Sequence, residues 1–447
     1  MADDVFVLGL DNHNHKLLKD LPDASQYRFH PLLTIEELQY GEQIPLRELL
    51  EKAQTQLENF DGSVDAIIGF WDFPVSTMVP ILCRRLGGLT CASLDAVVKC
   101  EHKYWSRLEQ QQVIDEYPAF GLVDPARDID PPEGVNYPLW VKPVKSSSSA
   151  LAFGVSNTGE FRDALEQIRP RIGRIGAPFE VVLEHLDLPD LIAEIGGQAC
   201  VAEESVSGRQ LTIEGYRYHG QTTIYGVVES ITYPDSPSFL RFQYPASVPD
   251  QVCDRMADVA ARVLEQVELN NTTFNIEFFW DEASDTLRVL EVNPRHSQSH
   301  AELFEQVDGA PNHQGMLRLA LGRDPDMPRR AGPYPLSAKW FLRHWNDGVV
   351  RREPTDDEVT ALERELDGVT IDLLAHQGDR LSALTSQDSY SYKIANIYTA
   401  AGNEQQLTAK FERCAQTLSF EFDQSPSSRM HSRVRPRRQR RPPQEEP

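Results

Sequence analysis

Two strand-like segments enclose a short acidic turn near residue 284, and this hairpin constrains the fold more than any other part of the chain. Thr273 to Trp280 and Leu287 to Asn293 flank the turn DEASD and alternate as a half-buried antiparallel pair does. A turn centred near Ser284 pairs Glu277 with Glu291. Period-two alternation then puts Asn293 and Arg295 on the same face as the two acids. The opposite, apolar face of this register contains Phe274, Ile276, Phe278, Trp280, Leu290 and Val292.

The polar face of this hairpin holds two opposed carboxylates, which repel each other unless a positive charge lies between them. Two carboxylates and an amide oxygen form a hard, oxygen-only site that suits Mg²⁺ bound together with phosphates. An exposed charged hairpin whose acids meet solvent is the alternative. Spacing alone leaves both interpretations open.

The segment NIEFFWDEASDTLRVLEVNPR resembles the closing motif of the ATP-grasp superfamily, in which an acid on one strand is followed by E-x-N-x-R on the next. The resemblance implies that Glu277, Glu291 and Asn293 hold magnesium on ATP, with Mn²⁺ as an alternative ion. It also implies that Arg295 faces the transferred phosphate and the acyl-phosphate formed from it. The resemblance extends over roughly residues 90 to 325. Within this range, two further stretches resemble motifs of the family and occur in the same order as in the family.

Two lysines match the nucleotide-binding lysines of that superfamily. Lys103 lies in the helical stretch SLDAVVKCEHKYWSRLEQQQV, and Lys142 lies in the apolar strand LWVKPV before four serines. Ammonium groups neutralise phosphate charge, and small residues let backbone N–H groups approach it. Ser147 and Ser148 are therefore predicted to contact ATP, although this loop has serines where the family frequently has glycines. A serine-rich linker is the alternative.

Residues 199 to 215 resemble the hinge between the two ATP-grasp lobes, where an acid contacts adenosine and the next backbone groups contact adenine. Glu203, Glu204 and Val206 are the matching positions. The stretch FEVVLEHL, with Glu184, is a competing hinge. We favour the later stretch because SGRQLTIEGYRYHG continues from it as the expected hairpin.

The order of predicted elements indicates α/β and α+β architecture with four segments. We expect a Rossmann-like pre-ATP-grasp domain over 1–98, an ATP-grasp domain with ATP between two lobes over 99–330, a C-terminal α+β subdomain over 331–423 and a disordered Arg/Pro-rich tail over 424–447. Helices are expected at Leu46 to Phe60, Gln251 to Val267 and Asp356 to Leu366.

Composition excludes several classes of protein. The formal net charge is -24, and because the last 24 residues contain seven arginines, the remainder is more acidic still and should not bind nucleic acid. The six cysteines form no CxxC pair, which argues against disulfide scaffolds and zinc modules. No run approaches the roughly 18 apolar residues of a membrane span. With no basic leader before VFVLGL, a cytoplasmic protein is expected.

The resemblance implies an ADP-forming carboxylate-amine ligase that acts on small molecules, such as amino acids or small peptides. A biotin-carboxylase-like enzyme is the first alternative, but its glycine-run loop and its bicarbonate motif are missing. A non-catalytic ATP-binding sensor or scaffold is the second, although such relatives tend to lose the arginine or a metal ligand. A homodimer is compatible with the sequence.

The residues after the arginine are unusually rich in histidine and serine, and we predict the acceptor or acyl site there. The candidates are His296, Ser297, Gln298, Ser299 and His300. Near the N-terminus, GLDNHNH ends the first strand, where α/β folds commonly bind ligands. An ordinary turn is the favoured interpretation of that loop.

Overall fold

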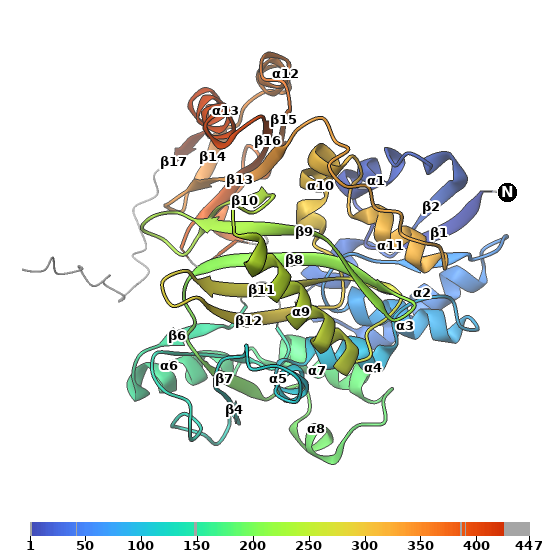
Figure 1. The fold of residues 1–447 in the computed structure, drawn as a ribbon, viewed down its shortest axis with the longest axis vertical. Coiled ribbons are helices and arrows are strands. Elements are labelled where there is room, and N and C mark those ends of the chain that lie inside the picture. The colour runs from blue at the N-terminus through green and yellow to red at the C-terminus, as the bar shows by residue number, and fades with distance from the viewer. Residues whose placement is uncertain (1, 42, 147–149, 385–386, 389, 424–447) are drawn as a thin grey trace, which may run out of the picture.

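The computed structural model describes residues 2–41, 43–146, 150–384, 387–388 and 390–423. It is a mixed helix and sheet structure, as predicted, with three sheets of three, four and eight main strands and a two-stranded ribbon. Figure 1 shows the largest sheet in the middle, the four-stranded sheet below it and the N-terminal sheet to one side. The predicted tail over 424–447 lies outside the described residues.

The N-terminal sheet is parallel, with the order β2-β1-β3. Its central strand is buried on both faces, which explains the continuous apolar run VFVL. Asp11 caps α1 by accepting from the backbone N–H of Asn14. The elements of this part are β1 Asp3–Leu8, α1 Asn12–Lys19, β2 Tyr27–Leu32, α2 Leu46–Glu58, β3 Ala66–Ile68 and α3 Val75–Arg85.

The four-stranded sheet is antiparallel, with the order β4-β7-β5-β6. Helices α4 and α5 precede it in the chain, and helix α7 packs its apolar side into the N-terminal core. The elements are α4 Leu94–Glu101, α5 Lys103–Gln110, β4 Phe120–Val123, β5 Leu139–Pro143, β6 Phe153–Val155, α6 Thr158–Ile168, α7 Gly173–Leu183, α8 Asp190–Ile195 and β7 Cys200–Glu204.

The eight-stranded sheet has the order β12-β11-β8-β9-β10-β13-β16-β15. The predicted amphipathic helix is α9, which packs on the first strands of this sheet. Its strands and helices are β8 Arg209–Tyr218, β9 Gln221–Thr232, β10 Phe239–Tyr244, α9 Asp250–Gln266, β11 Thr272–Asp281, β12 Thr286–Asn293, α10 Ala301–Asp308 and α11 His313–Ala320. None of the helices in the described part of the chain has the length and hydropathy of a membrane span.

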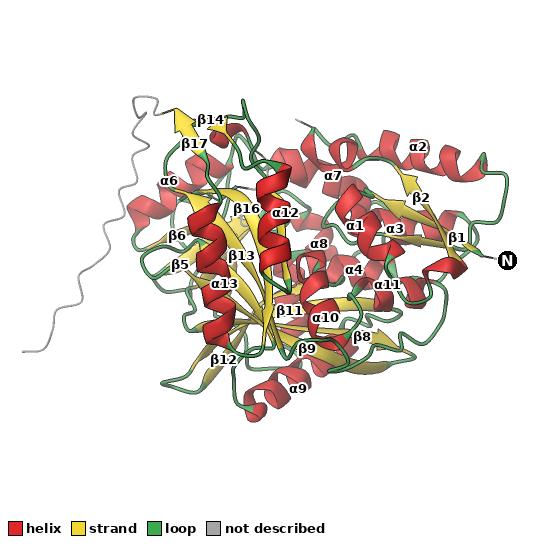
Figure 2. Cartoon of the chain, turned by 90° about the horizontal axis from the view of Figure 1, so that it is seen from above, coloured by secondary structure: helices red, strands yellow, loops and turns green. Residues whose placement is uncertain are grey.

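The C-terminal elements extend this sheet. Strands β13, β16 and β15 continue from β10, so the sheet crosses the predicted boundary at residue 330 without interruption. Helices α12 and α13 lie on these strands (Figure 2), and β14 pairs with β17 in a small separate ribbon. The bounds are β13 Leu336–His344, β14 Val349–Arg352, α12 Asp356–Glu365, β15 Val369–Leu373, β16 Tyr392–Ala401, α13 Glu404–Thr417 and β17 Glu421–Asp423.

The N-terminal sheet is completed by a helix from far along the chain. Met316 and Leu317 of α11 share a hydrophobic cluster with Val5, Val7 and Ile68. Packing therefore also crosses the predicted boundary at residue 98, because one face of the first sheet is covered by residues beyond 310.

Candidate active site

Strands β11 and β12 form the predicted hairpin, in which Glu277 lies opposite Glu291. The register shifts next to this pair, because Phe278 opposes Val289 and leaves Leu290 as an extra residue. A bulge reverses the alternation of the faces, so Val289 and Val292 are both in the core. The expectation that Leu290 also faces the core is wrong. Leu290 is only half-buried, and its carbonyl accepts from Arg107 Nη2 at 2.7 Å.

The polar face of the hairpin borders a cavity of about 170 Å³. All four residues of the predicted motif reach it, namely Glu277, Glu291, Asn293 and Arg295. The amide of Asn293 donates to Asn275 Oδ1 at 3.0 Å, which leaves its own oxygen available. The remaining lining residues are Asp72, Glu101, Lys145 and Ser146.

The two acids of the hairpin have different environments. Burial, followed by the nearby charge of Glu291, raises the pKa of Glu277 to about 7, although Gln210 donates to its carboxylate at 2.9 Å. Burial opposes the ionisation of Glu291 as well, but Lys103 and Lys142 outweigh it and lower the pKa of that acid. A divalent cation between these carboxylates would relieve the repulsion between them.

Lys103 connects the hairpin with the serine loop. It is the first residue of α5, and its Nζ donates to the Ser146 carbonyl at 2.7 Å. The same Nζ lies 2.6 Å from Glu291 Oε1. Ser147 and Ser148, predicted to contact ATP, lie outside the described residues.

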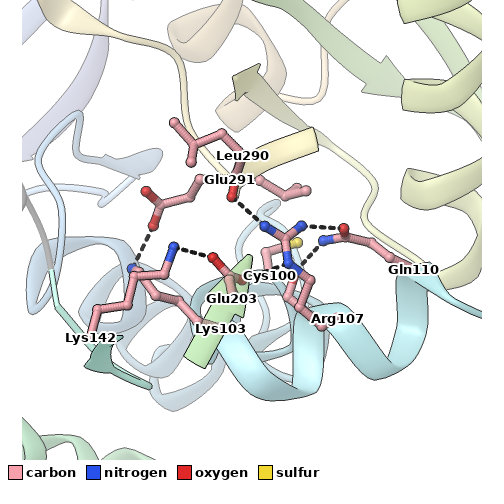
Figure 3. A pocket seen from close by; sticks show the side chains of 10 residues that line it. Cys100, Lys103, Arg107, Gln110, Lys142, Glu203, Leu290 and Glu291 are labelled. Atoms are coloured by element: carbon pink, nitrogen blue, oxygen red, sulfur yellow. Dashed lines mark hydrogen bonds and ion pairs between the residues drawn. The ribbon is translucent and has the colours of Figure 1, made fainter. Parts of the chain in front are cut away.

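Lys142 and Glu203 lie in a second pocket that Glu291 shares (Figure 3). Lys142 Nζ is 2.6 Å from Glu203 Oε2, and Arg107 Nε is 2.7 Å from Glu203 Oε1. Burial opposes the charge of Glu203, but the two cations overcome this and lower its pKa to about 2. The carboxylate is therefore ionised and fixed between them.

The remaining hinge candidates have surroundings that differ from those of Glu203. Glu204 follows Glu203 on β7, so its side chain points to the opposite face, where it accepts from the backbone and side chain of Asn136 at 3.0 and 2.7 Å. Val206 is half-buried between β7 and β8. In the competing stretch, Glu184 follows the last residue of helix α7 and pairs with Arg47 on an exposed surface, away from both pockets.

The two histidines of the predicted acyl site belong to internal hydrogen-bond networks. His296 is fully buried and bonds to Thr273 Oγ1 at 3.1 Å and to His313 at 2.8 Å. His300 is also buried and bonds to Glu214 at 2.6 Å. Neither lines the cavity that contains Arg295. Within the described ranges, no group of three or more His, Cys, Asp or Glu residues could hold a metal ion.

The three residues between these two histidines are partly exposed. Ser299 Oγ accepts from Lys339 Nζ on β13 at 2.7 Å, and the carbonyl of Ser297 accepts from Asn312 at 2.8 Å. Gln298 begins a short 3-10 turn and is half-buried. The chain after Arg295 thus passes beside the C-terminal strands. The first-strand loop is a helix-capping turn, in which Asp11 caps α1 and His13 lies 2.5 Å from Glu302.

Three charged residues of the cavity were not predicted. Asp72 comes from the loop after β3, while Glu101 and Lys145 form an ion pair of 2.9 Å. An acid in the loop that follows a buried strand is a signal that sequence alone offers for Asp72, since ligands meet parallel sheets at that edge. Glu101 and Lys145 are close in sequence to Lys103 and Ser146. The direction in which their side chains point, however, depends on the packing of distant elements.

Comparisons with known proteins identify the type of domain and the fold. Residues 135–301 match a family model described as ATP-grasp domain. The fold is similar to the L-amino acid ligase from Bacillus licheniformis, with a TM-score of 0.69 and 14% identity over 94% of this chain and 99% of that one. Phosphoribosylglycinamide synthetase from Anaerococcus prevotii has a TM-score of 0.63 and 12% identity over 95% and 100% of the two chains.

A third similar structure was crystallised with nucleotide. The biotin carboxylase domain of the Hydrogenobacter thermophilus 2-oxoglutarate carboxylase, in complex with MgADP, ADP and bicarbonate, has a TM-score of 0.61 and 12% identity over 94% of this chain and 91% of that one. A sequence comparison with curated proteins finds no match.

Proposed function

We propose that this chain, which carries an ATP-grasp domain, is an ADP-forming ligase that activates a carboxylate as an acyl-phosphate for attack by an amine. The observation that supports this most is the convergence of Glu277, Glu291, Asn293 and Arg295 on one cavity, with Lys103 bonded to Glu291 at its edge. Two carboxylates and an amide oxygen fit a hard divalent cation.

In this proposal, Glu277, Glu291 and Asn293 would hold Mg²⁺, or Mn²⁺ in its place, and the ion would neutralise charge on the ATP phosphates. Lys103 and Lys142 would bind those phosphates, with Ser147 and Ser148 closing over them. Glu203, Glu204 and Val206 would contact the nucleoside. A cytoplasmic location belongs to the same proposal.

Arg295 would stabilise the transferring phosphoryl group. A substrate carboxylate oxygen would attack the γ-phosphorus and ADP would leave, because the cationic side chains would lie around the terminal phosphates. The guanidinium then faces the acyl-phosphate. The carboxylate substrate would lie beyond Arg295, along the segment from His296 to His300, where Ser299 is the residue that Lys339 contacts.

A panel of amino acids and small acids tests this function, with nucleotide chromatography and mass spectrometry of the products. ADP and phosphate should form only when a carboxylate is present. Arg295→Ala should lower turnover on the order of 100-fold or more while ATP affinity stays close to that of the parent. AMP with pyrophosphate would contradict ligase chemistry of this type. Carboxybiotin would indicate the carboxylase alternative, and ATP binding without turnover across the panel would indicate a sensor.

A further inference from the structure

Asp72 reaches the cavity from the N-terminal sheet on a firmly held loop. The neighbouring Trp71 donates its indole N–H to the Gly9 carbonyl at 2.9 Å, and Phe70 and Phe73 on either side are buried. The backbone carbonyl of Asp72 accepts from Gln39 at 3.3 Å. The position of this carboxylate at the carboxyl end of β3 is therefore set by the scaffold.

Only one of the two carboxylate oxygens of Asp72 has a hydrogen-bond donor among the described residues. Arg295 Nε donates to Asp72 Oδ1 at 2.7 Å, and Nη2 contacts the same oxygen. No donor among the described residues reaches Oδ2, although Asp72 lines the cavity. A partly buried carboxylate that lines the cavity thus has one oxygen without a donor among the described residues.

The other cation that lines the cavity is paired with Glu101 and acts on Asp72 only through its charge. Lys145 Nζ is 2.9 Å from Glu101, both side chains are nearly inaccessible, and the ammonium lies 5.4 and 5.6 Å from the rings of Phe73 and Phe179. If Arg295 turns to a transferring phosphoryl group, Asp72 keeps no hydrogen-bonded cation among the described residues, and only the more distant charges of Lys145 and Lys103 still favour its ionised form. A new positive charge beside this partly buried carboxylate would replace the lost partner.

We propose that Asp72 binds the ammonium group of the acceptor substrate and accepts a proton from it. This inference rests on the proposed function and narrows its second substrate to an amine that is protonated near neutral pH. One proton passes from the ammonium to Oδ2, and the nitrogen lone pair attacks the acyl carbon. The new C–N bond forms as the C–O bond to phosphate breaks. The second proton of the nitrogen leaves with the phosphate, and the proton on Asp72 passes to solvent.

The test uses Asp72→Asn and Asp72→Glu in the full chain, with the carboxylate and amine that give turnover in the panel. Hydroxylamine serves as the probe, because it is neutral near pH 7 and traps an acyl-phosphate as a hydroxamate without needing an anionic partner. Asp258→Asn is the matched control, since Asp258 also pairs with an arginine, at 2.8 Å from Arg262 on the outer surface of α9.

We expect Asp72→Asn to raise the KM for the amine on the order of 10-fold to 100-fold, the effect of losing a hydrogen bond to a charged group. Hydroxamate formation should stay within a few-fold of the parent, Asp72→Glu should recover part of the amine affinity, and Asp258→Asn should behave as the parent does. Equal losses of hydroxamate and amide would show instead that Asp72 only positions Arg295.

An unchanged KM for the amine in Asp72→Asn would also overturn the inference. Failure of the parent protein to form ADP with any carboxylate is a separate outcome. It would overturn the proposed function itself, and the inference that rests on it.

Discussion

Lys103 Nζ lies 2.6 Å from Glu291 Oε1, although the two residues are 188 positions apart in the chain. The pair joins the start of α5 to strand β12 and keeps both charges compensated in a buried setting. Each partner also has a use in the proposed complex, the lysine at a phosphate and the acid at a cation. On binding of magnesium and ATP, Lys103 would exchange Glu291 for a phosphate, and Glu291 would exchange Lys103 for the cation. Neither charge would be left uncompensated.

The first prediction concerns that acid. Glu291→Gln removes one anionic ligand and the counter-charge of Lys103, so magnesium-dependent turnover should fall on the order of 100-fold or more. Steady-state assays across a magnesium titration measure this effect. Glu265→Gln, at an exposed position of α9, is the control. Parent-like activity of Glu291→Gln at limiting magnesium would refute the metal assignment.

A second prediction follows from Glu277, whose pKa is raised from 4.5 to about 7 by burial and by Glu291. The folded state binds this proton more tightly than the unfolded state, so the stabilising contribution is present below the ordinary pKa and is lost as the pH rises through about 7. Glu277→Gln should therefore be more stable than the parent at about pH 8, with a smaller difference at about pH 5.

Urea unfolding of both proteins at the two pH values, without added metal, checks this prediction. Magnesium binding should show the opposite trend, because the ion needs the ionised carboxylate, so its affinity for the parent should rise between about pH 6 and 8. A pH-independent stability difference between Glu277→Gln and the parent would contradict the argument.

The third prediction concerns the support of the second pocket. Arg107 and Glu203 are both buried, and Arg107 also donates to the carbonyl of the bulge residue Leu290. Arg107→Met should lower the free energy of unfolding by about 3 kcal/mol, since breaking a buried ion pair leaves an undercompensated charge. Arg413→Met removes an exposed pair of 3.1 Å with Glu365 and should cost less than about 1 kcal/mol. Similar losses of unfolding free energy in Arg107→Met and Arg413→Met would show that burial does not determine how much an ion pair contributes to stability.

The fourth prediction concerns the C-terminal tail. Deleting 424–447 should leave turnover and ATP affinity within a few-fold of the parent, because a segment with seven arginines and few apolar residues cannot form a pocket of its own. Activity and nucleotide titrations of the truncated chain measure this. A loss of ATP binding would show that the tail contributes to the active site.

The hairpin and its register could be predicted because strand alternation is a local property. Glu277 and Glu291 are opposed as expected, and the cavity-facing positions follow from parity. The bulge at Leu290 could not be predicted, since the strand pattern alone does not mark it and the carbonyl of Leu290 is paired with Arg107 of the distant helix α5. A single extra residue then reversed the expected face of that side chain.

The direction in which a side chain points relative to distant elements was harder to predict from the sequence. The histidines after Arg295 suggested a reactive segment, but His296 faces His313, and His300 faces Glu214 on β8. Asp72 enters the cavity only because the N-terminal sheet packs against the hairpin region, a contact between segments 223 positions apart. Neither relationship has a local signature in the sequence.

The covering of the first sheet by α11 has a consequence for biosynthesis. The ribosome must add everything from Ile68 to His313 before Met316 and Leu317 can cover Val5 and Val7, which takes on the order of ten to fifty seconds at about 5–20 residues per second. During that interval the nascent N-terminal unit carries an incompletely covered apolar face. Chaperone binding during translation is therefore expected to protect this unit until α11 has emerged.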